Sequence, residues 1–138
     1  MSKYIKTYLF AEIAVRAEYN HNYLEKQCKD YETDQNPQLT IEVTADDIIK
    51  ERSFSEDGES FSDGYIESLA FYRKFCEAIA SCDVILFHCA AVAVDGKAYL
   101  FTAPSGTGKT THIGLWQKIH GDKMTIVNGD KPLLKISK

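Results

Sequence analysis

A glycine-rich segment between a predicted strand and a predicted helix constrains this chain more than any other feature of its sequence. The segment reads Ala-Pro-Ser-Gly-Thr-Gly-Lys-Thr and spans residues 103–110. Its two glycines let backbone N–H groups turn inward, where they and the positive end of the following helix can hold phosphate oxygens. A strand–turn–helix context of this kind is what a phosphate-binding loop (Walker A motif) requires. The sequence therefore predicts a phosphate site between this strand and this helix.

The side chains of this loop have separate expected roles. Lys109 would reach the β- and γ-phosphates of a nucleotide, and the Thr110 hydroxyl would bind Mg²⁺. Ala103 stands where the motif usually begins with glycine, a mild change if this residue keeps a negative φ. The residues expected to contact the nucleotide are Ser105, Gly106, Thr107, Gly108, Lys109, Thr110 and Thr111.

Length and charge exclude several classes of protein. The chain has 138 residues, enough for one domain with a single core. Its 16 basic and 20 acidic residues give a net charge of -4, which argues against a nucleic-acid partner bound through a broad basic face. No apolar run reaches the ~20 residues that span a bilayer, and the N-terminus does not have the pattern of a signal peptide. We expect a cytoplasmic protein without a membrane partner.

Periodicity and turn signals place the elements along the chain. The combination of predicted strands and predicted helices indicates an α/β fold with a mixed sheet, of the α+β kind, in one domain. Residues 1–62 would form an N-terminal strand and loop region, and residues 63–138 a core around the phosphate-binding loop. Predicted strands cover 4–18, 39–44, 84–94, 97–102 and 124–127, with a hairpin turn at Asp95-Gly96. Predicted helices are a short one capped by Thr44 and ending at Arg52, then 63–81 and 109–119.

Two further side chains are candidates for chemistry. Asp130 ends the strand after the loop helix, where proteins with this loop commonly place an acidic residue near the metal. His88 lies in the apolar run 84–94, where a lone histidine is usually a packed core residue. A zinc site from Cys82, His88 and Cys89 matches no standard ligand spacing, so reduced thiols are expected.

The order of these motifs resembles a known family. The residues concerned are His88, Asp95-Gly96, Ser105 to Thr110 and Asn128-Gly129-Asp130. Together they resemble the HPr kinase/phosphorylase-like group of P-loop proteins, and the loop is also similar to that of ATP-dependent phosphoenolpyruvate carboxykinases. The resemblance covers about residues 71–134.

The resemblance implies a fold and a reaction. The implied fold is a sheet-based kinase core in which a strand hairpin precedes the phosphate-binding loop. The implied reaction transfers the γ-phosphate of ATP to a serine hydroxyl of a protein or peptide, with His88, Lys109 and Asp130 as catalytic residues. In this scheme Asp130 takes the hydroxyl proton, His88 holds or polarises Asp130, and Mg²⁺ is bound by Thr110 and Asp130.

Two departures from the family pattern leave alternatives open. Lys131 stands where the group has a second acidic residue, and the chain ends at Lys138, soon after Asp130. We therefore expect an N-terminal fragment or a shortened relative of a longer kinase. The alternatives are a nucleotide- or phosphate-binding module without turnover, and a structural or interaction domain. Because missing strands would leave a sheet edge exposed, we also expect self-association into a homo-oligomer.

Overall fold

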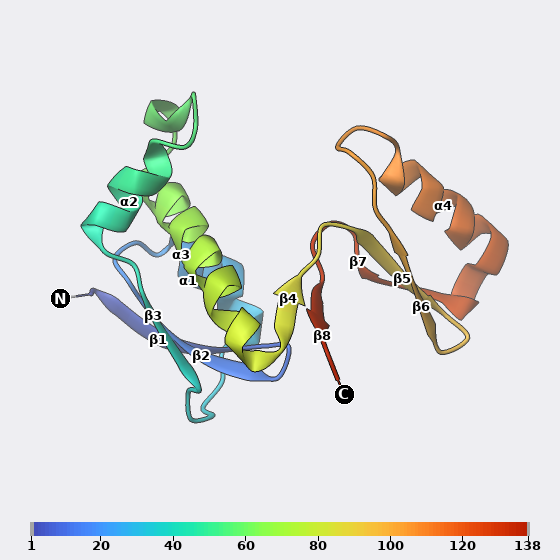
Figure 1. Cartoon of the computed structure of the whole chain (residues 1–138), viewed down its shortest axis with the longest axis horizontal. Helices are drawn as coiled ribbons and strands as arrows, with labels where there is room; N and C mark the ends of the chain where they lie inside the picture. The colour runs from blue at the N-terminus through green and yellow to red at the C-terminus, as the bar shows by residue number, and fades with distance from the viewer. Residues whose placement is uncertain (1, 138) are drawn as a thin grey trace. The chain divides into compact units, whose positions relative to one another are not determined.

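The computed structural model describes residues 2–137 and divides the chain into two compact units, with the boundary between Asp83 and Val84. Each unit combines helices with small sheets, so the expected α+β class is confirmed at this coarse level (Figure 1). The long helix that begins after residue 62 packs on the elements that precede it, so it belongs to the first unit. Within residues 2–137, no helix is both long and apolar enough to cross a membrane.

The sheet of the first unit has the order β1-β2-β3. Strands β1 (Tyr4–Phe10) and β2 (Ile13–Tyr19) form an antiparallel hairpin, and β3 (Leu39–Glu42) pairs parallel with β2. The prediction of one strand over 4–18 is therefore wrong. The turn between the strands places Ala11 and Glu12 at φ 48° and 66°, a conformation that neither residue type signals in a sequence.

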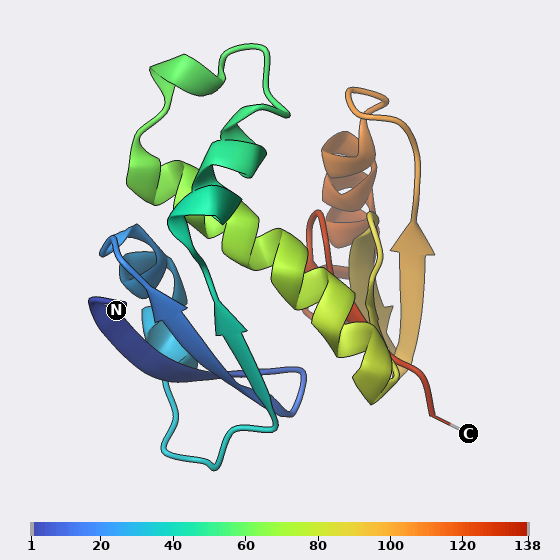
Figure 2. The ribbon, with the colours of Figure 1, turned by 60° about the vertical axis from the view of Figure 1, so that its left-hand side comes forward.

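Three helices complete the first unit. Short α1 (Tyr23–Cys28) follows β2. Thr44 is the N-cap of α2 (Ala45–Arg52), as predicted, and its hydroxyl accepts a hydrogen bond from the Asp47 backbone N–H. Helix α3 (Asp63–Ile79) lies over one face of the sheet (Figure 2). The centroid of its Phe75 ring lies 5.2 Å from that of the Phe10 ring in β1. A short 3-10 turn over Ala80–Cys82 follows it.

A buried carboxylate ties the end of β2 to α3. Glu67 of α3 has no exposed surface, and its two oxygens accept hydrogen bonds from the backbone N–H groups of Asn20 (2.7 Å) and His21 (2.8 Å). The Nδ1 atom of His21 lies 3.2 Å from the same carboxylate. A buried charge is tolerated only with such partners, so Glu67 fixes the connection between β2 and α1.

The second unit contains the glycine-rich loop at residues 103–110. It contains β4 (Val84–Leu86), β5 (Ala90–Val94), β6 (Lys97–Phe101), α4 (Lys109–His120), β7 (Met124–Asn128) and β8 (Leu133–Lys135). Strand β5 lies at the centre of a β6-β5-β7 sheet, antiparallel to both neighbours, whereas β4 pairs with β8 in a second sheet. The predicted strand 84–94 is therefore wrong, since its two halves pair with different partners and residues 87–89 connect them.

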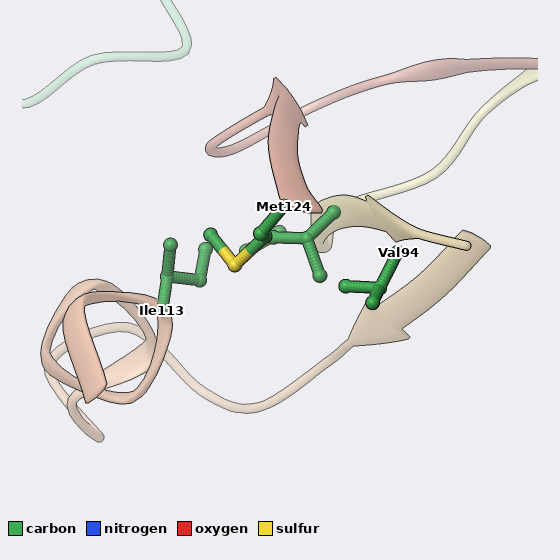
Figure 3. Close-up of a cluster of buried hydrophobic side chains, with 5 residues drawn as sticks. Val94, Ile113 and Met124 are labelled. Atoms are coloured by element: carbon green, nitrogen blue, oxygen red, sulfur yellow. The ribbon is translucent and has the colours of Figure 1, made fainter. Parts of the chain in front are cut away.

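Helix α4 packs on one face of the three-stranded sheet. The buried side chains of this core come from the sheet and from Ile113 of α4, with Phe101 and Trp116 packed against them; they are Ala90, Val92, Val94, Ile113 and Met124. Figure 3 shows Ile113 directed from the helix toward Met124. Burial of these apolar groups, at roughly 25 cal/mol per Å², holds the helix against the sheet.

The topology brings three connections to one end of the strands of this sheet. Strands β6 and β7 are both antiparallel to β5, so they run parallel to each other and finish at the end where β5 begins. The pairs Ala90–Phe101 and Ala91–Asn128 lie at that end. The loop after β6, the turn after β7 and the connection before β5 therefore meet there.

Candidate functional site

The loop between β6 and α4 has the backbone that its glycines predict. Gly106 and Gly108 have φ values of 79° and 99°, in the left-handed region that glycine enters without strain. Among residues 2–137 the non-glycine residues with positive φ are Ala11, Glu12, Asp83 and Asp95, so Ala103 is not strained in place of glycine. Gly108 is the N-cap of α4, and among the described residues no side chain caps this helix end. The first backbone N–H groups of a helix have no partner within the helix and are donors of the kind that bind anions.

The lysine of the loop bonds to the loop itself. The Nζ atom of Lys109 donates to the Ala103 carbonyl at 2.8 Å, which ties the start of α4 to the first residue of the loop. The backbone N–H and the hydroxyl of Thr107 both donate to the Pro104 carbonyl, at 3.3 Å and 2.6 Å. These bonds hold the ammonium group beside the backbone that would surround a phosphate.

The remaining loop residues lie where the sequence places them. Ser105 is exposed in the loop, and Thr110 and Thr111 are exposed in the first turn of α4. The Thr110 hydroxyl and the Asp130 carboxylate are oxygen donors of the kind that Mg²⁺ prefers, and Mg²⁺ usually completes its shell with water and substrate phosphates. Within the described residues, no three His, Cys, Asp or Glu side chains form a group that could hold a metal by themselves.

His88 and Asp130 are hydrogen-bonded to each other. The Nε2 atom of His88 lies 3.1 Å from Oδ1 of Asp130, although the two residues are far apart in the sequence. His88 was expected within a strand, but it lies in the connection between β4 and β5, because the two halves of the apolar run 84–94 form separate strands. Both side chains are open to solvent, with 50% and 66% of their surfaces exposed. In the part of the chain that the structure describes, Lys109 is bonded to Ala103 and to neither of them.

Two side chains that the sequence analysis did not assign hold this pair in place. The Oδ1 atom of Asn128 accepts the backbone N–H groups of Asp130 and Lys131, both at 2.9 Å, in an Asx turn. The Thr102 hydroxyl donates to the His88 carbonyl at 3.2 Å. The turn residues Asn-Gly-Asp carry a signal for the first of these contacts, whereas the second depends on strand pairing alone.

A cavity of about 560 Å³ opens beside the loop. Its lining combines loop residues that include Gly108 and Lys109 with two threonines, the rings of Phe101 and His112, and the Leu115 side chain. Its lining residues are Phe101, Thr102, Ala103, Thr107, Gly108, Lys109, Thr111, His112 and Leu115. The volume lies within the range of roughly 300–1,000 Å³ that is typical of small-molecule sites.

Comparisons with protein-family models, with curated proteins and with solved structures give no match for this chain. Its function is therefore inferred from the residues and geometry of this site.

Proposed function

We propose that this chain binds ATP with Mg²⁺ at the 103–110 loop and transfers the γ-phosphate to a serine hydroxyl of a protein or peptide, as the HPr kinase-like proteins that it resembles do. The observation that carries the proposal is the hydrogen bond between His88 and Asp130 at 3.1 Å, at the same end of the sheet's strands where the loop begins. An acid–base pair beside a phosphate-binding loop is the arrangement that phosphoryl transfer to a hydroxyl needs.

In the proposed step the serine hydroxyl oxygen attacks the γ-phosphorus atom. A bond forms between these atoms, the bond from phosphorus to the β–γ bridging oxygen breaks, and ADP leaves. The hydroxyl proton moves to the Asp130 carboxylate, which His88 orients through its Nε2 atom. Lys109 offsets negative charge on the phosphates, and bound Mg²⁺, held by Thr110 and Asp130, would neutralise further charge on them.

Solvent exposure of the pair favours a second candidate function, nucleotide binding without turnover. Efficient phosphoryl transfer depends on excluding water from the reacting groups. Asp130 and His88 keep 66% and 50% of their side-chain surfaces exposed, so the described residues leave the pair open to water. On this alternative the loop binds the nucleotide, and no phosphate reaches a peptide.

The first experiment measures binding of ATP with Mg²⁺ by calorimetry for the full chain, Lys109→Ala and Lys118→Ala. Lys118 is an exposed lysine in the last turn of the same helix, so it is the matched control for a loss of charge. We expect Lys109→Ala to weaken ATP binding at least about tenfold, about 1.4 kcal/mol, and Lys118→Ala to bind as the unchanged chain does. Equal ATP affinity in the two variants would refute both candidate functions.

The second experiment separates the two candidates. Radiolabelled γ-phosphate is offered with a library of serine peptides to the unchanged chain and to Asp130→Asn. Transfer that Asp130→Asn abolishes, while ATP still binds, supports the kinase. ATP binding without transfer by the unchanged chain supports the module without turnover.

A further inference from the structure

The cavity beside the loop has an apolar wall that the proposed phosphoryl chemistry does not use. Phe101, at the end of β6, forms the wall together with His112 and Leu115 from α4. The Phe101 and His112 rings meet edge to face, with centroids 4.7 Å apart and an interplanar angle of 78°. Leu115 keeps 51% of its surface exposed beside them.

Packing behind this wall holds its rings in place. Trp116 lies next along α4, and its ring contacts Phe101 at 5.1 Å between centroids. The Trp116 ring also contacts the ring of Tyr99 in β6, with centroids 5.0 Å apart. The wall is therefore a preformed surface, so the protein loses little conformational entropy when a flat group binds to it.

Position links this wall to the phosphate site. Gly108 and Lys109, which would contact phosphates, line the same cavity as Phe101, His112 and Leu115. A ligand that fills the cavity therefore carries a negative end at the loop and a flat apolar end a short distance away. A nucleotide has this combination.

We propose that the nucleotide base binds against the wall formed by Phe101, His112 and Leu115, a proposal that rests on the proposed nucleotide binding. Stacking and apolar contact supply the affinity for the base, and every base has a π-face. Because the wall is made of two rings and a leucine, it discriminates little between purines. Affinities for ATP and GTP are expected to agree within about fivefold, since discrimination between bases depends on directed hydrogen bonds.

The test compares ATP, GTP and inorganic tripolyphosphate, all with Mg²⁺, by calorimetry on the full chain. Tripolyphosphate has the charge of the nucleotide and no base. The variant is Leu115→Gln, and the control is Ile119→Gln, one turn further along α4, where the side chain is 76% exposed and is not part of the cavity lining. Glutamine keeps the helix propensity and adds no charge, so both variants should remain folded.

We expect Leu115→Gln to weaken ATP and GTP about fivefold, with tripolyphosphate affinity changed less than about twofold, as expected from the loss of part of one leucine contact. Ile119→Gln should leave all three affinities unchanged. The inference fails if Leu115→Gln leaves ATP affinity unchanged, as it would if the wall held a side chain of the peptide acceptor. It also fails if ATP and tripolyphosphate weaken equally, or if ATP binds no tighter than tripolyphosphate. A chain that binds neither ATP nor tripolyphosphate refutes the proposed function itself.

Discussion

Two glycines of one helix should respond in opposite ways to the same substitution. Gly108 caps α4 with φ 99°, whereas Gly114 lies inside the helix, and an added Cβ would meet no atom within 4 Å at either position. The effect of alanine is therefore conformational at both sites. A left-handed alanine costs roughly 1–2 kcal/mol, offset in part by about 0.4–1 kcal/mol from the stiffer unfolded chain. We expect Gly108→Ala to lower the free energy of unfolding by about 1 kcal/mol, and Gly114→Ala to raise it by about 0.5–1 kcal/mol.

The single tryptophan makes this difference measurable in the second unit alone. Trp116 lies on α4 and packs against Phe101, so its fluorescence during urea or thermal unfolding reports on this unit. A difference of about 1.5–2 kcal/mol between the variants corresponds to roughly 10 °C in Tm for a unit of this size. A rise in Tm for Gly108→Ala as well as for Gly114→Ala would show that residue 108 does not adopt the left-handed backbone in solution, and the predicted loop conformation would then be wrong.

Four other perturbations test separate parts of the structure. Glu67→Gln leaves a buried backbone N–H facing an amide group, so urea unfolding followed by circular dichroism should show a loss of about 2 kcal/mol in the free energy of unfolding. A loss below about 0.5 kcal/mol would contradict the role of Glu67 in fixing the connection between β2 and α1. Asn128→Ala should speed amide hydrogen exchange at Asp130 about fivefold while Asn128→Asp keeps its protection, because aspartate restores the acceptor; equal exchange in both variants would refute the Asx turn. Burial raises the pKa of the Cys28 thiol to about 11, so at pH 8 only about 0.1% of it is thiolate. The rate of labelling of Cys28 by iodoacetamide should therefore be low at pH 8 and rise nearly tenfold per pH unit toward pH 10. Fast labelling at pH 8 would contradict this burial. Strand β7 is an edge strand and Val127 on it is 59% exposed, so light scattering should show self-association that Val127→Lys reduces, and a monomer at high concentration would contradict the expectation.

Local interactions explain what the sequence alone predicted correctly. The cap at Thr44 depends on a side chain three residues away, and the Asp95-Gly96 turn places its residues at φ 48° and 75°, as aspartate and glycine allow. The same holds for the start of α4 after Gly108, which follows from glycine spacing. These features involve neighbours in the chain, so a short stretch of sequence contains the information that determines them.

Long-range pairing decided the rest. Whether residues 84–94 form one strand or two depends on which strands they meet, and β4 finds β8 while β5 finds β6 and β7. Because of this division, His88 lies in the connection between β4 and β5, where it contacts Asp130. The family resemblance implies this contact, whereas the spacing of the two residues in the sequence does not predict it. The role of Asn128 and the wall beside Lys109 also depend on segments that meet only in the folded unit. The sequence by itself determined the glycine-rich turn before α4, through local backbone preferences. The tertiary structure decided which side chains surround this turn, because burial and strand register act between distant residues.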